Sequence, residues 1–205
     1  MICHKHKFIF VHINKTAGTS LEWVLMKHSN NRRVGKRKPG ISLIGRTKHR
    51  PVSEYKIIAD KIYGFKNYFK FTLVRNPWQR LLSNYFFRKY KKGDTDIQKL
   101  SFTEWVKNSN KRGYLFENCL SRYAQLDWIT DENGEVCVDF IGRFENLQED
   151  FNTICDKIGI PRNELPHKNA TKHKHYTEYY DDESIFIVAE KYAKDIEYFG
   201  YKFGE

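Results

Sequence analysis

The sequence predicts a single α/β domain with a mainly parallel sheet that is covered by helices on both faces. Short β-branched and aromatic runs alternate with segments whose apolar residues have helical spacing, which is the pattern of βαβ units. With 205 residues and 40% hydrophobic content, the chain is long enough for one sizeable core. We therefore expect one domain over residues 1–205, with ligands near the carboxyl ends of the strands.

Local signals define the individual elements. The predicted strands are residues 7–13, 41–44, 68–74 and 140–144. Apolar residues at helical spacing predict helices around residues 21–28, 53–63, 81–86, 147–158 and 185–196, with two shorter helical patterns in 102–123. Asn76 and Pro77 are a favoured pair at a helix start, and Gly159 is typical of a helix end. Three isoleucines of the helix at 53–63 are expected to face inward: Ile57, Ile58 and Ile62.

Charge and cysteine content narrow the partners and the compartment. The formal net charge of +11 favours anionic partners, including nucleotides, acidic glycans, nucleic acids and membrane surfaces. The four cysteines form no CxxC pair, so neither zinc nor disulfides are indicated. No apolar stretch approaches the ~20 residues that cross a bilayer, and residues 1–7 do not resemble a signal peptide. We expect a cytoplasmic protein without an integral membrane segment.

A loop of small residues follows the first predicted strand. It runs from Asn14 to Ser20 and leads directly into a helix. Small side chains let a phosphate approach the backbone N–H groups, the helix dipole favours negative charge, and Lys15 adds a cation. The lysine precedes Gly18, whereas a Walker A motif has its lysine after the second glycine. The loop predicts an anion site; the alternative is an ordinary tight turn with a surface lysine.

A cation follows the strand at residues 71–74. A nucleoside triphosphatase needs a magnesium-binding carboxylate at such a strand end, but this chain has Arg75 there. The arrangement favours a nucleotide whose phosphates are neutralised by protein cations without a metal, with Arg75 on one phosphate and Ser83 supplying a hydroxyl. The alternative for Arg75 is a buried salt bridge.

These two segments resemble the sulfotransferases. HINKTAGTS is similar to their 5′-phosphosulfate loop and RNPWQRLLSNYFF to their 3′-phosphate segment; QLDWITDENGEVCVDFIGRFENL and LPHKNATKHKHY extend the resemblance over most of the chain. The resemblance is strongest to soluble relatives of the carbohydrate sulfotransferases. It implies a P-loop-like three-layer fold. One departure is Asn14, where the family usually has proline, which would loosen the entry to the loop without removing a cation.

The resemblance also implies a donor and a set of contacts. The donor would be 3′-phosphoadenosine 5′-phosphosulfate (PAPS), the product 3′-phosphoadenosine 5′-phosphate (PAP), and the acceptor a hydroxyl of a glycan, with no metal. Lys15 would contact the bridging oxygen, and Arg75 and Ser83 the 3′-phosphate. The 5′-phosphate would be surrounded by Thr16, Ala17, Gly18, Thr19 and Ser20.

Sulfuryl transfer also requires a base for the acceptor proton, and histidine suits that role near neutral pH. His49 is the main candidate because it follows a predicted strand and because Lys-His at this place matches the family; the alternative is a solvated loop histidine. Glu54 is a weaker candidate. His12 lies within the first strand and is expected to be a satisfied core residue.

The basic segment before the last helix predicts a flap over the nucleotide, with Lys174 as a phosphate contact. Its histidines, His167, His173 and His175, have no acidic or cysteine partner at ligand spacing, so a metal cluster is disfavoured. Two other functions stay open. A P-loop kinase would need a magnesium carboxylate, and a nucleic-acid-binding module would suit the charge and the aromatic content but lacks any RNP, zinc-finger or helix-turn-helix signature.

Overall fold

The computed structural model describes residues 1–29, 49–61, 64–90, 95–111, 123–166 and 174–205. The chain forms two compact units, and each collects two stretches of sequence. The first unit comprises Met1–Val74 and Asp127–Lys168, and the second comprises Arg75–Leu126 and Asn169–Glu205. The single domain over 1–205 stays a prediction. The strand predicted at 41–44 lies outside the described residues.

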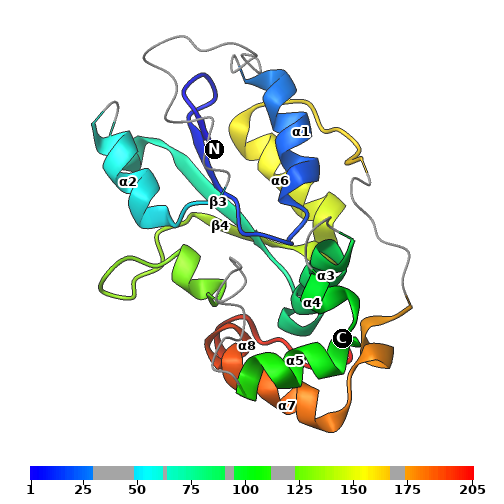
Figure 1. Ribbon diagram of the computed structural model, residues 1–205. Coiled ribbons are helices and arrows are strands. Elements are labelled where there is room, and N and C mark those ends of the chain that lie inside the picture. Colours follow the sequence, from blue (N-terminus) through cyan, green and yellow to red (C-terminus); the bar gives the residue numbers. More distant parts are fainter. Residues whose placement is uncertain (30–48, 62–63, 91–94, 112–122, 167–173) are drawn as a thin grey trace. The chain divides into compact units, whose positions relative to one another are not determined.

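The first unit is built on a four-stranded sheet (Figure 1). Its strands, in spatial order, are β1 (Ile2–Cys3), β2 (Phe8–Val11), β3 (Phe69–Val74) and β4 (Phe140–Arg143). β1 pairs antiparallel with β2, and the other pairs are parallel. Since β2, β3 and β4 run in one direction, their carboxyl ends meet at one edge of the sheet. The predicted mainly parallel sheet is confirmed.

Helices cover both faces of this sheet. They are α1 (Gly18–His28), α2 (Val52–Asp60) and α6 (Leu147–Ile158). Phe8, Phe10, Phe71 and Leu73 alternate along their strands and form one hydrophobic core with α1 and α6. α2 contacts β2 and lies on the opposite side of the sheet in Figure 1. The three-layer α/β fold predicted from the sequence is therefore present.

The second unit packs helices around an aromatic core. Its elements are α3 (Pro77–Lys89), α4 (Thr95–Gln98), α5 (Phe102–Lys111), the 3-10 helix η5 (Tyr176–Tyr179), α7 (Asp182–Lys191) and α8 (Ala193–Phe199). The core includes Trp78, Tyr85, Trp105 and Tyr192. The 3-10 helices η1 (Phe65–Asn67) and η4 (Phe144–Asn146) belong to the first unit, and η3 (Leu126–Trp128) lies at the boundary between the two units in the sequence.

Several predicted helix ends are confirmed. The Asn76 side chain accepts hydrogen bonds from the N–H groups of Trp78 and Gln79 at the start of α3. Gly159 ends α6 with a left-handed φ of 68°.

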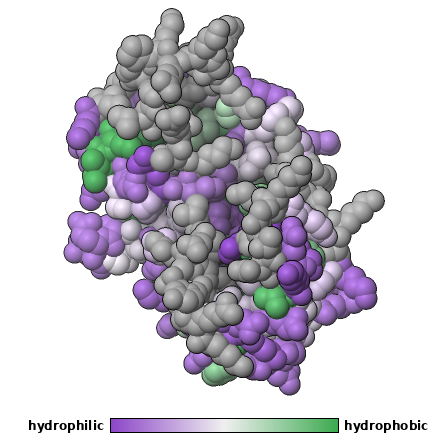
Figure 2. Space-filling model, viewed as in Figure 1, coloured by the Kyte–Doolittle hydropathy of each residue, from purple (hydrophilic) through white to green (hydrophobic). Residues whose placement is uncertain are grey.

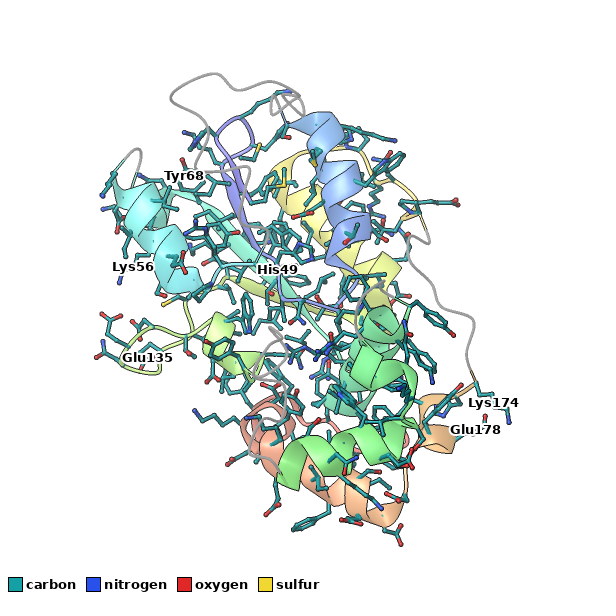
Figure 3. The ribbon with its side chains drawn as sticks, in the orientation of Figure 1. His49, Lys56, Tyr68, Glu135, Lys174 and Glu178 are labelled. Atoms are coloured by element: carbon teal, nitrogen blue, oxygen red, sulfur yellow. The ribbon has the colours of Figure 1, made fainter. Side chains whose placement is uncertain are left out.

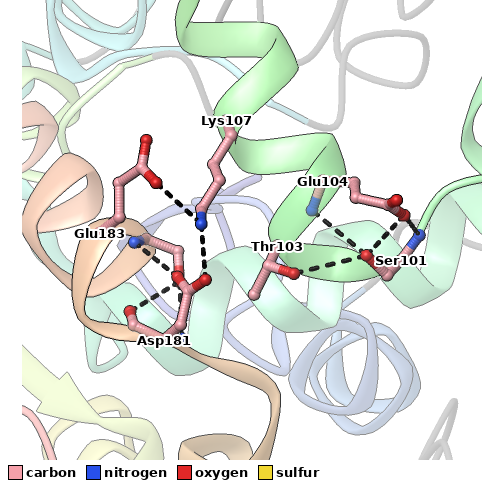
Figure 4. A network of polar contacts seen from close by, with 7 residues as sticks. Ser101, Thr103, Glu104, Lys107, Asp181 and Glu183 are labelled. Atoms are coloured by element: carbon pink, nitrogen blue, oxygen red, sulfur yellow. Dashed lines mark hydrogen bonds and ion pairs between the residues drawn. The ribbon is translucent and has the colours of Figure 1, made fainter.

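Asp181 caps α7, and its carboxylate also contacts the Lys107 ammonium of α5 at 2.6 Å (Figure 4). The hydrogen bond from Lys107 lowers the pKa of the Asp181 carboxyl to about 2.

Two helix predictions were wrong. The inward face of α2 consists of Val52, Tyr55 and Ala59, whereas Ile57 is 60% exposed and Ile58 is only partly buried; Ile62 lies outside the described residues. α2 carries two apolar stripes, and packing on β2 selects the first; Figure 2 shows hydrophobic surface over α2. The last helix is also two helices, because Tyr192 between α7 and α8 leaves helical geometry with φ −114° and ψ 27°. Its buried ring packs in the aromatic core, so tertiary packing overrides the continuous apolar stripe.

Among the described residues, no helix is both long enough and apolar enough to cross a membrane.

Candidate active site

The loop between β2 and α1 has a strained backbone. Lys15 and Ala17 both have left-handed φ values, 67° and 65°. Such a conformation costs roughly 1 kcal/mol or more for a residue with a Cβ atom, and it persists only where the surroundings impose it. α1 begins at Gly18 directly after this turn, so the N–H groups of its first turn face the loop. A helix N-terminus of this kind can bind an anion, and the anion site at this loop stays a prediction.

A buried acid–histidine pair packs against this loop at Gly18. His12 is 3% exposed, and its Nδ1 donates to Glu22 Oε1 of α1 at 2.9 Å. A Cβ atom on Gly18 would lie 2.1 Å from Cδ2 and Nε2 of the His12 ring, so only glycine allows this close approach. The Thr16 hydroxyl donates to the Ile13 carbonyl at 2.9 Å. These contacts impose the strained turn, and they confirm His12 as a satisfied core residue.

The structure brings His49 next to the same loop. His49 Nδ1 lies 2.9 Å from the carbonyl oxygen of His12, three residues before Lys15. A carbonyl only accepts, so Nδ1 must carry the proton, and Nε2 is then the nitrogen of the neutral ring that can accept one. The His49 ring also packs against His12, with centroids 4.5 Å apart, and edge-on against Trp128. Figure 3 shows His49 beside the end of β2.

The weaker base candidate has a different environment. Glu54 lies in the first turn of α2 and accepts a hydrogen bond from Arg50, so it forms an ion pair within its own helix end. Its side chain is 45% exposed. Glu54 thus already has a cationic partner, whereas His49 is hydrogen-bonded to the backbone carbonyl of His12.

In the second unit, Arg75 directly precedes the N-cap of α3. Its Nε donates to Gln79 Oε1 at 3.3 Å. Ser83 lies four residues after Gln79 on the same helix and is half-buried. Residues at this spacing share one face of a helix, so the guanidinium and the hydroxyl belong to one side of α3. This local geometry suits the gripping of one anionic group.

One family model matches the chain over nearly its whole length. The model of the sulfotransferase family matches residues 1–202. The chain belongs to the sulfotransferase family. It is 27% identical over 157 residues to carbohydrate sulfotransferase 14 of Danio rerio, a match of 64% of this chain and 41% of that protein. The chain therefore matches about two-fifths of the length of that relative.

Two other proteins are also similar to this chain. An uncharacterized protein of Archaeoglobus fulgidus is 37% identical over 99 residues, which is 47% of this chain and 72% of that protein. The crystal structure of a sulfotransferase from Alicyclobacillus acidocaldarius covers 96% of both chains at 15% identity, with a TM-score of 0.46.

Lys174, the last of the predicted site residues, has an acidic partner. The Lys174 ammonium lies 3.1 Å from the Glu178 carboxylate on η5, and its side chain is 75% exposed (Figure 3). To bind a phosphate, the Lys174 ammonium would therefore have to leave its exposed ion pair with Glu178. His175 contacts the Thr177 hydroxyl, while His167 and His173 lie outside the described residues. Within the described ranges, no group of three or more His, Cys, Asp or Glu side chains could hold a metal ion.

The predicted site residues are divided between the units. Lys15 to Ser20 and His49 belong to the first unit, whereas Arg75, Ser83 and Lys174 belong to the second. Sequence reasoning missed Glu22, the partner of His12 beside the loop, and Gln79, the partner of Arg75. Glu22 interrupts the apolar stripe of α1 at a buried position, which is a signal for a buried polar contact. Gln79 follows Arg75 by four residues but carries no other signal.

Proposed function

We propose that this chain transfers the sulfuryl group of PAPS to a hydroxyl of an acceptor molecule, with PAP as the product. One observation carries the proposal. Lys15 lies in a strained loop at the start of α1, and His49 is hydrogen-bonded to the backbone carbonyl of His12, directly after β2. A cation for the leaving group and a base for the acceptor thus belong to one structural unit.

The donor contacts in this proposal are those that the resemblance implies, and the local geometry within each unit supports them. The backbone N–H groups at residues 16–20 and the N-terminus of α1 bind the 5′-phosphosulfate. Arg75 and Ser83 bind the 3′-phosphate, for which a guanidinium provides paired donors. Lys174 is proposed as an additional phosphate contact. Protein cations neutralise the nucleotide in this scheme, and no step needs a metal.

The reaction is a single in-line displacement at sulfur. The acceptor hydroxyl oxygen forms a bond to sulfur while the bond from sulfur to the bridging oxygen of PAPS breaks. The hydroxyl proton passes to His49 Nε2, and the bridging oxygen leaves as part of the 5′-phosphate of PAP. Lys15 stabilises the negative charge that develops on that oxygen, so catalysis is mainly positioning and electrostatics, as in phosphoryl transfer.

A carbohydrate is the acceptor class that we propose. The likeness to carbohydrate sulfotransferase 14 supports it, although that match includes 41% of the relative's length. The net charge of +11 suits an acidic glycan better than a neutral one. The Danio rerio protein is named as acting on carbohydrate, and the extension to this chain belongs to the proposal.

Transfer of label from [³⁵S]PAPS to a panel of glycans and small hydroxyl compounds tests this function. We expect Lys15→Ala to lower kcat roughly 100-fold or more, and His49→Ala to lower it by a similar factor. Lys27→Ala and His28→Ala, on the last turn of α1, are matched controls that should keep wild-type turnover. Full turnover in His49→Ala would refute the base, and loss of transfer in EDTA would contradict the metal-independent reaction.

A further inference from the structure

The backbone of Arg75 is bracketed by the side-chain amide of Gln125, fifty residues later in the chain. The Arg75 N–H donates to Gln125 Oε1 at 2.9 Å, and Gln125 Nε2 donates to the Arg75 carbonyl at 2.8 Å. Gln125 is fully buried. Both residues belong to the second unit. One side chain thus satisfies both backbone groups of the arginine that is proposed to contact the 3′-phosphate.

Asp195 of α8 determines which way this amide points. Its carboxylate accepts hydrogen bonds from the backbone N–H groups of Gln125 and Leu126, at 2.8 and 2.9 Å. It also accepts from Gln125 Nε2 at 3.3 Å. A carboxylate accepts only, so a flipped amide would place two oxygens against each other. Asp195 therefore keeps Gln125 Oε1 toward the Arg75 N–H.

The carboxylate keeps this role although it is buried. Burial raises the pKa of the Asp195 carboxyl, while the charge of Arg80 and the hydrogen bonds from Gln125 and Leu126 act in the opposite direction. Arg80 is 1% exposed and donates to the Tyr123 carbonyl at 3.3 Å. The carboxylate oxygens are contacted by three N–H donors, so they act as acceptors in this network.

We infer that Gln125 and Asp195 are positioning residues, which hold the Arg75 backbone so that its guanidinium is preset for the 3′-phosphate of the nucleotide. The inference rests on the proposed function. A backbone held at both its N–H and its C=O leaves only side-chain rotamers to be ordered on binding, and preorganisation of this kind lowers the entropic cost of the contact.

Calorimetric titration of the full chain with PAP and with adenosine 5′-phosphate tests the inference, because the second nucleotide lacks only the 3′-phosphate. Gln125→Met removes both hydrogen bonds to the Arg75 backbone and keeps a side chain of similar volume. We expect it to weaken PAP binding about tenfold and to leave adenosine 5′-phosphate binding unchanged. In an Arg75→Ala background, Gln125→Met should have no further effect on PAP binding, because the group that it positions is gone.

Gln148→Met is the matched control. The Gln148 amide also brackets backbone groups, since it accepts from the Leu165 N–H at 2.9 Å and donates to the Asn163 carbonyl at 3.0 Å. Gln148 belongs to α6, and the backbone groups that it brackets have no proposed contact with the nucleotide, so PAP binding should stay at the wild-type level. If Gln125→Met does not fold, Gln125→Asn keeps the amide but shortens its reach, and the same titrations apply.

The outcomes separate the inference from the function. Wild-type chain that binds PAP no better than adenosine 5′-phosphate would contradict the proposed roles of Arg75 and Ser83. A wild-type preference for PAP that persists in the Gln125 variant would overturn the inference alone. Equal weakening of both nucleotides would also overturn it, because a general structural role would not distinguish the 3′-phosphate.

Discussion

In the first unit, Lys15 lies on a loop with two left-handed non-glycine residues, whereas in the second unit Arg75 precedes a helix with ordinary capping geometry. The loop is imposed by close packing of the His12 ring under Gly18. The Arg75 segment is held instead by directed hydrogen bonds from Gln125. Packing tolerates no added atoms, while a hydrogen-bonded bracket depends on the orientation of one amide. The two proposed phosphate contacts should therefore respond to different kinds of substitution.

Gly18→Ala should have the largest effect. The added methyl would lie 2.1 Å from the His12 ring, so the ring or α1 must move. We expect the free energy of unfolding to fall by roughly 2–3 kcal/mol, as for other overpacked sites, together with loss of sulfuryl transfer. Urea unfolding and a transfer assay measure both. Unchanged stability would show that the loop is not held by this contact.

Glu22→Leu should have the next largest effect. The substitution leaves His12 Nδ1 buried without its acceptor, which costs about 1–3 kcal/mol. PAP and adenosine 5′-phosphate should both bind more weakly, because the loop is proposed to contact the 5′ side that they share. Glu149→Leu, at an exposed site on α6, should change stability by less than about 0.5 kcal/mol. If Glu22→Leu weakened the binding of PAP alone, this would contradict the proposal that the loop of the first unit contacts the 5′ side shared by both nucleotides.

Lys107→Met should have a smaller effect that depends on pH. The folded-state pKa of Asp181 is about 2, below the ordinary 3.8. The ion pair therefore contributes stability above about pH 4, and this contribution disappears as the pH falls toward 2. Since the Asp181 side chain is 46% exposed, solvent screening keeps the contribution of this ion pair small.

The difference in unfolding free energy between wild type and Lys107→Met, measured from pH 5 to pH 2, checks this prediction. It should narrow as the pH falls. Lys99→Met, at an exposed site after α4, should show no such narrowing. A difference that grows toward pH 2 would reverse the sign of the proposed linkage.

Ala17→Gly should have the smallest effect, and it should be stabilising. Glycine removes the cost of the left-handed conformation at φ 65°, although it adds freedom to the unfolded chain. We expect the free energy of unfolding, measured by thermal unfolding, to rise by up to about 1 kcal/mol. Ala59→Gly, within α2, should instead be destabilising by about 1 kcal/mol or more. A loss of stability in Ala17→Gly would mean that the turn is not strained.

Features set by neighbouring residues were predictable. The helix start at Asn76, the helix end at Gly159 and the loop between β2 and α1 all depend on contacts within a few residues, and each was confirmed. The inward face of α2 was not predictable in this way, because two apolar stripes on one short helix compete and only the sheet selects between them.

The candidate site shows the same division. The sequence was sufficient to identify the small-residue loop, with Lys15 within it, and the cation at the end of β3, because backbone conformation and strand termini are local properties. Only the tertiary structure decided the Nδ1 tautomer of His49, the buried His12–Glu22 pair under the loop and the Gln125 bracket on Arg75. The Gln125 bracket depends in turn on Asp195, seventy residues away. Contacts at such separations form only when the chain has folded, since a sequence specifies which groups can pair but not which distant partners packing brings within reach.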